Sequence, residues 1–309
     1  MTDIMAGSAP QIIKDFAAFA ETCFENYGDR VKHWITFNEP HTVAIQGYDV
    51  GLHAPGRCSI FLHLFCHDGN SATEPYIVAH NMLLSHGTVA DIYRKKYKAK
   101  QQGSLGISLD VIWFEPATNT TDDIEATQRA QDFQLGWFIE PLILGNYPIS
   151  MRNRVGDRLP NFTKNDVALV KGSLDFVGIN HYTTFYAQNN GFLLRDLIGK
   201  VLHDSLSDSG TLTLPFGENL KPIGDRVCTS LNLNISIHHL DHITMSYECK
   251  NYMCIHLEER HARGCNAKLE TFECSLFLIP FFFLQTSFAG SQFVQFIFGY
   301  IQIHSPSFL

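Results

Sequence analysis

Short, almost continuously apolar segments alternate with longer helical repeats over residues 11–180 of this chain. The segments expected to be strands are 34–37, 105–109 and 174–179. The segments expected to be helices are 12–24, 74–97 and 124–138, where apolar side chains recur every three or four residues. Strands that are apolar on both faces and alternate with helices are typical of a parallel sheet covered by helices.

Two architectures satisfy this alternation, a doubly wound sheet and a (β/α)8 barrel. No glycine-rich phosphate loop follows any of the strands, which weakens the case for a dinucleotide-binding sheet. Polar residues follow the first and third strands, at Asn38, Glu39, Asn180 and Tyr182. Because barrel enzymes carry their chemistry at the carboxyl ends of the strands, we favour an α/β barrel.

Composition sets the class of protein and excludes some functions. Of the 309 residues, 45% are hydrophobic and 17% are charged, as in a folded globular protein. The formal net charge of -8 offers no basic surface for nucleic acid. The eight cysteines include no CxxC pair, so no redox motif, metal site or cofactor is expected.

Glu39 ends the first buried strand and is followed by Pro40. Burial disfavours the ionised form of a carboxyl group, so a glutamate in this position is suited to general acid catalysis. A glutamate placed like this more often caps the next helix or pairs with an arginine. The surrounding motifs decide between these roles.

A series of motifs gives this chain a resemblance to the family-one glycoside hydrolases, the β-glucosidases and their relatives. The motif at residues 36–40 (TFNEP) resembles the acid/base signature of that family. Further motifs follow in the family's order, at 51–58 (GLHAPGRC), 70–76, 79–81, 132–137, 141–148 (PLILGNYP), 158–163, 175–186 (DFVGINHYTTFY) and 222–226. The resemblance covers residues 11–226, and chance does not place so many motifs in one order.

The resemblance implies retaining hydrolysis of a β-glucoside by two carboxyl groups about 5 Å apart. It implies that Glu39 is the acid/base and that Asn38 binds the sugar 2-hydroxyl. It also implies that Tyr182 orients the nucleophile and that Asn180 lies at the end of the same strand. On its spacing alone, Tyr182 would instead be interpreted as a residue that packs at the top of the barrel. Because position 39 is Glu and not Gln, the chain does not resemble a myrosinase. No aglycone and no oligomeric state follow from the sequence.

The family's nucleophile is the glutamate of an I/V-T-E-N-G motif, which the 309 residues do not contain. The early Gln and His and the late Trp/Glu-rich segment that hold the sugar are also absent. By this resemblance the chain contains strands four to six of eight, so we expect an inactive chain and two open sheet edges. Three readings follow: a β-glucosidase-like enzyme, a glycoside-binding remnant, and a truncated product without function.

Cys58 and Cys66 lie where plant members of the family carry a disulfide, so the resemblance implies a bridge, the alternative being two free thiols. A disulfide requires an oxidising compartment. Three Asn-X-Ser/Thr triplets match the pattern for N-linked glycosylation, which is relevant only if the protein is secreted. They begin at Asn119, Asn161 and Asn234. Residues 1–10 contain no apolar stretch of the kind found in a signal peptide. Members of the family are mostly secreted, vacuolar or plastidic. Because these two observations point in different directions, no compartment is assigned.

Composition changes after Arg226, which divides the chain into three parts. They are a divergent N-terminus (1–10), a partial β-glucosidase-like barrel (11–226) and an apolar, Cys-rich tail (227–309) expected to be unrelated to the family. Residues 275–309 contain no Asp, Glu, Lys or Arg, but Pro280 and the polar residues 285–287 interrupt the run, which disfavours a membrane span. The spacing of Cys254, His256, His261 and Cys265 fits no standard zinc site.

Overall fold

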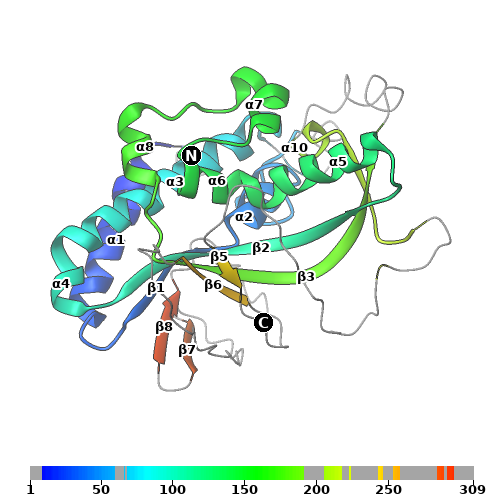
Figure 1. Ribbon diagram of the computed structural model, residues 1–309. Helices are drawn as coiled ribbons and strands as arrows, with labels where there is room; N and C mark the ends of the chain where they lie inside the picture. Colours follow the sequence, from blue (N-terminus) through cyan, green and yellow to red (C-terminus); the bar gives the residue numbers. More distant parts are fainter. Residues whose placement is uncertain are drawn as a thin grey trace, which may run out of the picture.

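The computed structural model describes residues 9–59, 66, 68–190, 205–217 and 223, and the backbone of four short strands between residues 243 and 295. The side chains of Tyr182 and Leu206 lie outside this description. The described elements form two layers, with helices gathered over one face of a sheet (Figure 1).

Three parallel strands form the centre of the sheet and pair in chain order. They are β1 (His33–Asn38), β2 (Ser104–Pro116) and β3 (Phe176–Asn189). The longer helices are α1 (Gln11–Tyr27), α2 (Pro40–Tyr48), α3 (Glu74–Ile92), α5 (Thr121–Gln131) and α6 (Trp137–Leu144). The shorter ones are α4 (Lys98–Gln101), α7 (Ile149–Val155), α8 (Lys164–Val170), α10 (Ser205–Asp208), the π-helical η3 (Tyr93–Tyr97) and η4 (Asp132–Gly136), and the 3-10 helix η5 (Gly156–Arg158).

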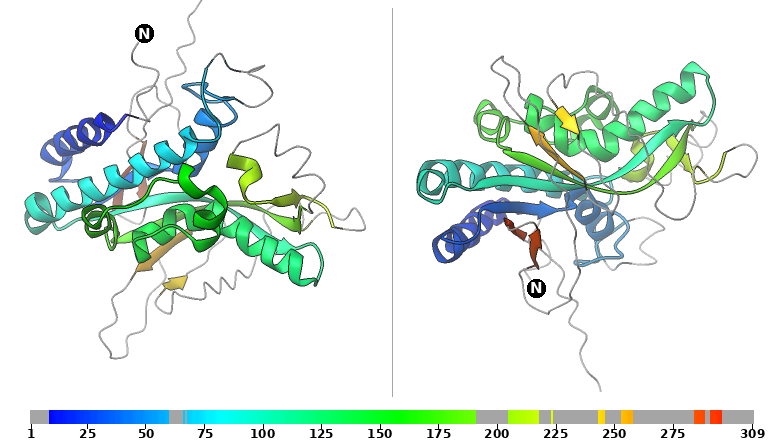
Figure 2. Two further views of the ribbon diagram at one scale, coloured as in Figure 1. Left: turned by 90° about the horizontal axis from the view of Figure 1, so that it is seen from above. Right: turned by 60° about the horizontal axis from the view of Figure 1, so that its bottom comes forward.

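The order of the strands distinguishes between the two architectures that the sequence allows. Consecutive parallel strands are direct neighbours, and α1, α3, α5 and α6 all lie on the same side of the sheet (Figures 1 and 2). A doubly wound sheet reverses its strand order at a switch point and carries helices on both faces, whereas a barrel does neither. The strands and helices therefore have the arrangement of a barrel segment.

Aromatic side chains join the helical layer to the sheet. Phe24 of α1 meets Trp34 of β1 edge to face, with ring centroids 5.0 Å apart, and Phe16 stacks on Phe37 at 4.5 Å. All four rings are buried, so the apolar spacing predicted over residues 12–24 is the face that α1 presents to β1. The right-hand view of Figure 2 shows α1 alongside this strand.

The helical predictions are confirmed with two changes of detail. The helix expected over residues 74–97 is α3 continued by η3, and the helix expected over 124–138 contains η4 before α6 begins. Gly28 follows α1 as expected but is right-handed, with φ -70°. Gly28 lies against the side chain of Gln101, which donates a hydrogen bond to Phe24 O at 2.8 Å, and a Cβ at Gly28 would collide with it.

Strands β2 and β3 are much longer than the apolar segments predicted at 105–109 and 174–179. Their parallel pairing continues from Gly106–Phe176 as far as Pro116–Ala187, and both strands run on together beneath α5 (Figure 1). The end of β3 also pairs with the antiparallel strand β4 (Thr211–Leu214). Backbone pairing extends the strands past the point where the apolar pattern stops.

The sheet that the structure describes still has two ends, but β1 and β3 are not its edge strands. On one side β8 (Ser291–Gln295) pairs in parallel with β1, and on the other β6 (Met253–Leu257) pairs antiparallel with β3. The outermost strands are β7 (Leu284–Phe288) and β5 (Ile243–Met245). An uncovered edge offers a row of free N–H and C=O groups, and β8 and β6 of the tail pair with those of β1 and β3.

Several expectations about the tail fall outside the described residues. They concern Asn234, the uncharged run after Cys274 and the side chains of Cys254, His256, His261 and Cys265. Among the helices that are described, none has both the length and the apolar character needed to cross a bilayer. The described side chains also bring together no group of three or more His, Cys, Asp or Glu able to hold a metal ion.

Candidate active site

Strand β1 ends in a bulge immediately before the Asn38-Glu39 pair. His33–Ile35 pair with Ser104–Gly106 residue for residue, but Asn38 then pairs with Ser108. Strand β1 therefore has one more residue than β2 between these pairs. A bulge bends the strand and re-aims the side chains that follow, and bulges are frequent beside active sites.

Glu39 has a left-handed backbone, with φ 53° and ψ 55°. This conformation costs a residue other than glycine about 1–2 kcal/mol, so neighbouring groups must hold it. The Glu39 N–H donates to Ser108 O at 2.8 Å, and Glu39 O accepts from the Val43 N–H at 3.1 Å in α2. Glu39 occupies the N-cap position of α2, yet its side chain makes no capping hydrogen bond. The carboxylate is thus not used as a helix cap.

The side-chain amide of Asn180 joins the ends of β1 and β3. Asn180 Nδ2 donates to Asn38 Oδ1 at 2.9 Å and to Glu39 Oε1 at 2.8 Å. The Ser108 hydroxyl donates in turn to Asn180 Oδ1 at 3.1 Å. Asn180 and Ser108 are both buried. The structure thus brings together three residues singled out from the sequence, and adds Ser108 from the intervening strand.

Tyr182 lies in a second irregularity, on β3. Val111 pairs with His181 and Ile112 pairs with Thr183, so Tyr182 is an extra residue on the β3 side. Its side chain lies outside the described residues. The neighbouring His181 places Nδ1 at 3.1 Å from Val111 O, and burial lowers the pKa of this imidazole. His181 is therefore neutral near pH 7.

Asp110 forms a polar cluster that was not singled out from the sequence. Its Oδ2 lies 3.2 Å from His41 Nδ1 and accepts from Thr42 Oγ1 at 3.1 Å and from Gln134 Nε2 at 3.1 Å. Burial alone would raise the pKa of Asp110, but its hydrogen bonds, first that with His41, outweigh burial and lower it. The ionised carboxylate ties the first turn of α2 to β2 and η4. Its sequence signal is a polar residue directly after the apolar run 105–109.

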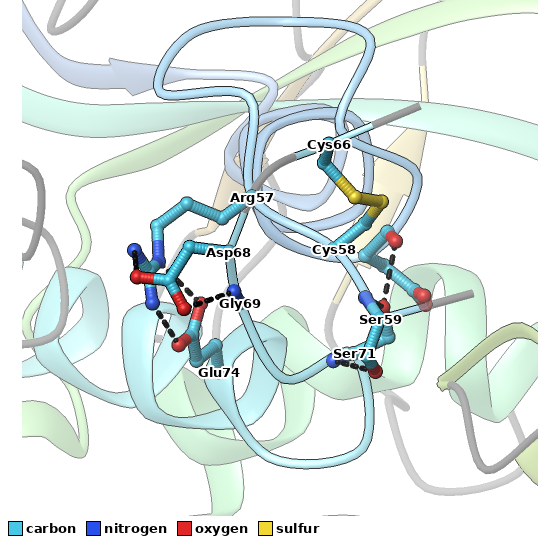
Figure 3. Close-up of a disulfide and its surroundings, with 9 residues drawn as sticks. Arg57, Cys58, Ser59, Cys66, Asp68, Gly69, Ser71 and Glu74 are labelled. Atoms are coloured by element: carbon cyan, nitrogen blue, oxygen red, sulfur yellow. Dashed lines mark hydrogen bonds and ion pairs between the residues drawn. A yellow bond between two sulfur atoms is a disulfide. The ribbon is translucent and has the colours of Figure 1, made fainter. Parts of the chain in front are cut away.

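A disulfide between Cys58 and Cys66 closes part of the chain between α2 and α3 (Figure 3). The two Cα atoms are 5.7 Å apart, and both cysteines are buried. The segments on either side are also joined by two reciprocal hydrogen bonds. Ser59 N donates to Ser71 Oγ at 2.8 Å, and Ser71 N donates to Ser59 Oγ at 2.9 Å.

Arg57 holds the same region through a buried ion pair. Arg57 Nε donates to Glu74 Oε2 at 2.8 Å and Nη2 donates to Oε1 at 2.7 Å, as Figure 3 shows. The side chains of Arg57 and Glu74 are only 6% and 9% exposed. The hydrogen bond to Glu74 raises the pKa of Arg57, and Asp68 accepts a further bond from Nη1 at 3.0 Å. This pair fixes the segment after α2 to the first turn of α3.

Comparison with known proteins relates this arrangement to one family. The sequence profile of glycosyl hydrolase family 1 matches residues 6–196. Beta-glucosidase 40 of Arabidopsis thaliana is 71% identical over 217 residues, which are 70% of this chain and 42% of that protein. Beta-glucosidase 34 of Oryza sativa subsp. japonica is 65% identical over 216 residues, with the same two shares. The chain therefore spans less than half the length of these relatives.

Solved structures give the same relationship. A crystal structure of a rice β-glucosidase superposes with a TM-score of 0.68 at 63% identity, covering 71% of this chain and 45% of that one. A β-glucosidase from the fungus Humicola insolens, in complex with glucose, superposes with a TM-score of 0.65 at 38% identity, covering 71% and 44%. The central strands and their helices are thus part of a (β/α)8 barrel.

Proposed function

Since this chain belongs to glycosyl hydrolase family 1, we propose that it carries the acid/base half of a retaining β-glucosidase active site. Glu39 is the acid/base in this proposal, and Asn38 binds the sugar 2-hydroxyl. Tyr182 occupies the position of the family's tyrosine that orients the nucleophile. The observation that carries the proposal is the buried Asn180 amide, which bonds to Asn38 and Glu39 together at the carboxyl ends of the strands.

The chemistry of the complete active site, of which this chain carries one half, is a double displacement. Glu39 protonates the glycosidic oxygen while a second carboxylate attacks the anomeric carbon, and Glu39 then removes a proton from the water that releases the sugar. A variant of the rice β-glucosidase, with one Glu replaced by Gln, is described in a covalent complex with glucose. A covalent sugar–enzyme intermediate is what this mechanism requires.

The second carboxylate has no assigned residue in this chain. The glutamates after Asp225 are Glu248, Glu258, Glu259, Glu270 and Glu273, and Asn-Gly follows none of them. Glycosidase carboxylates act as a pair, so one alone retains little of the rate enhancement. We therefore propose that the 309-residue polypeptide by itself binds β-glucosides weakly and does not turn them over. The intact Asn38-Glu39-Asn180 cluster favours this binding role over a chain without function.

Binding of p-nitrophenyl β-D-thioglucoside tests the proposal, because its sulfur bridge resists hydrolysis. Saturation-transfer NMR should detect binding with Kd on the order of 1 mM. Asn38→Ala should weaken binding about tenfold, the effect of losing one hydrogen bond of about 1.4 kcal/mol. The matched control is Asn161→Ala, at an exposed position away from the cluster. Absence of binding, equal binding of the α-anomer, or equal loss in both variants would contradict a β-glucoside site.

A further inference from the structure

Ser108 and Asp110 lie two residues apart on β2 and hold the chain on either side of Glu39. On the side before it, the Glu39 N–H donates to Ser108 O at 2.8 Å. On the side after it, Asp110 Oδ2 accepts from Thr42 Oγ1 at 3.1 Å and lies 3.2 Å from His41 Nδ1, both in the first turn of α2. Strand β2 therefore fixes both the end of β1 and the beginning of α2.

Only Glu39 and Pro40 separate these two attachments. Pro40 begins α2, and its ring holds φ at about -65°. The direction in which α2 leaves β1 therefore depends mainly on the backbone angles of Glu39. These angles, φ 53° and ψ 55°, lie in the left-handed region. A movement of the first turn of α2 relative to β2 would rotate the Glu39 backbone.

The sequence itself disfavours this backbone conformation. The left-handed region is unfavourable for any residue with a Cβ atom, and a residue that precedes proline is driven towards an extended conformation. Both effects act on Glu39. Such a conformation persists only where the surrounding structure holds it. If α2 lost its attachment to β2, Glu39 would relax towards an extended backbone.

That relaxation would displace the Glu39 carboxyl group. Glu39 Oε1 accepts from Asn180 Nδ2 on β3 at 2.8 Å. Rotation about the backbone bonds of Glu39 moves its Cβ, and with it the carboxyl group, relative to this amide. A general acid has to lie within hydrogen-bond distance of the oxygen that it protonates, so a displaced carboxyl group would transfer its proton slowly.

We propose that Asp110 is a positioning residue, whose carboxylate holds the first turn of α2 on β2 and thereby keeps Glu39 left-handed with its carboxyl group at Asn180. The proposal rests on the acid/base role of Glu39. Asp110 is 8% exposed, and its Oδ2 also accepts from Gln134 Nε2 at 3.1 Å, which holds the carboxylate from η4. The group that anchors α2 is thus itself held in place.

The Glu39 amide proton reports the backbone conformation. At a positive φ the amide and α protons of one residue lie closer together than at a negative φ, so the NOE between them is stronger. Spectra of the full 309-residue chain labelled with 15N-glutamate should show this strong NOE for Glu39. Glu39→Gln identifies the signal by removing it. Asp110→Ala should weaken the NOE and shift the amide signal.

Asp110→Asn should restore the wild-type NOE. It keeps an oxygen for the hydroxyl of Thr42 and the amide of Gln134. Its NH2 group would take the place of Oδ1, which has no hydrogen-bond partner among the residues that the structure describes. Rescue by this variant would show that the anchoring hydrogen bonds, rather than the volume of the side chain, hold Glu39.

Thr42→Val tests the same attachment by a smaller change, since it removes one hydroxyl and keeps the shape of the side chain. It should produce part of the Asp110→Ala effect, which guards against a folding defect of that variant. The matched control is Asp123→Ala, because Asp123 is also buried and accepts from the hydroxyl of Thr118 at 2.6 Å. It should leave the Glu39 signals unchanged.

Catalysis provides a second measurement. With phenyl β-D-glucoside and azide, azide bonds to the anomeric carbon as the bond to phenoxide breaks, and Glu39 gives its proton to the phenoxide. Asp110→Ala should slow this reaction about 100-fold, whereas Asp123→Ala should not. An unchanged Glu39 NOE in folded Asp110→Ala and Thr42→Val, or equal slowing by Asp123→Ala, would overturn the positioning role. If the NOE behaved as expected but wild-type chain formed no glucosyl azide, the proposed acid role of Glu39 would be contradicted instead.

Discussion

Asn180 Nδ2 lies 2.8 Å from Glu39 Oε1, although the two residues are 141 positions apart in the chain. The bond ties the carboxylate at the end of β1 to a buried amide on β3, with β2 between them. Because Glu39 Oε1 accepts this bond, the position of the Glu39 carboxylate is set relative to β3 as well as to β1. A carboxylate held by a neighbouring strand is preorganised for proton transfer.

Azide should replace the missing nucleophile if Glu39 is an acid. We expect wild-type chain supplied with phenyl β-D-glucoside, whose leaving group needs protonation, and azide to form α-glucosyl azide. Azide attacks the anomeric carbon from the face opposite the leaving group, the C–O bond breaks, and Glu39 gives its proton to the departing phenolate. Product configuration is read by NMR. Glu39→Gln should abolish formation of the glucosyl azide. Glu125→Gln, a control at an exposed position, should leave it unchanged. Equal amounts of product from wild-type chain, Glu39→Gln and Glu125→Gln would contradict the role of Glu39.

Breaking the buried pair between Arg57 and Glu74 should destabilise the fold strongly. Arg57→Met leaves the Glu74 carboxylate, which is 9% exposed, without its bidentate partner. The free energy of unfolding should fall by about 3–5 kcal/mol, because an unpaired buried charge remains. Urea unfolding followed by circular dichroism measures the change.

Lys95→Met is the matched control for Arg57→Met. Lys95 pairs with Asp91 at 2.8 Å, but the two side chains are 72% and 42% exposed. An exposed pair of this type contributes only about 0.5 kcal/mol. The double variant Arg57→Met/Glu74→Leu should recover much of the loss, since it leaves no unpaired charge. Equal losses for Arg57→Met and Lys95→Met would show that burial of the pair adds nothing.

The disulfide between Cys58 and Cys66 should contribute measurably to stability. The two cysteines are 8 positions apart, and closing so short a loop in the unfolded chain stabilises by about 2.5 kcal/mol on the chain-entropy relation. We expect Cys58→Ser/Cys66→Ser to lose that amount in urea unfolding. Dithiothreitol should have the same effect on wild-type protein and none on the double variant. If dithiothreitol did not lower the free energy of unfolding of the wild-type chain, the prediction would be contradicted.

His86 should make the fold sensitive to mild acid. Burial lowers its pKa from 6.5 to about 3, and its Nδ1 lies 2.7 Å from Thr36 Oγ1. Between these two pH values the unfolded chain binds the proton and the folded chain does not, so stability falls as the pH drops below 6.5. By pH 5 the loss from this group is about 2 kcal/mol.

His86→Gln isolates this contribution from that of other groups. The variant cannot take up a proton at residue 86, so its stability should decline less steeply than that of wild-type protein between pH 6.5 and pH 5. Urea unfolding at several pH values gives both curves. Parallel curves would mean that His86 is already protonated in the folded chain, contrary to its burial.

Much of this fold follows from local patterns. The apolar runs 34–37 and 105–109 lie in β1 and β2, and the run 174–179 enters β3 at Phe176. The apolar side chains spaced three and four residues apart in α1, among them Phe16 and Phe24, form the face packed on β1. These features depend on side-chain periodicity, which a sequence displays directly. Asn38 and Glu39 stand out for the same reason, because they interrupt an apolar run.

Other features depend on which strands meet, and periodicity does not reveal that. The bulge before Asn38 inserts one residue in β1 relative to β2, which is visible only when both strands are paired. Ser108 looks like any small polar residue of a strand until Asn180 is placed beside it. Strands of the tail cover the outer sides of β1 and β3 through backbone hydrogen bonds, to which side-chain patterns contribute little.

Release of p-nitrophenol from p-nitrophenyl β-D-glucoside, without azide, tests the central claim most directly. The claim is that Glu39 supplies an acid while the 309 residues supply no nucleophile. We expect wild-type chain and Glu39→Gln to release p-nitrophenol at the same rate, that of buffer alone. Enzymatic turnover by the wild-type chain that Glu39→Gln abolishes would contradict the claim, and would mean that this chain contains a second working carboxylate.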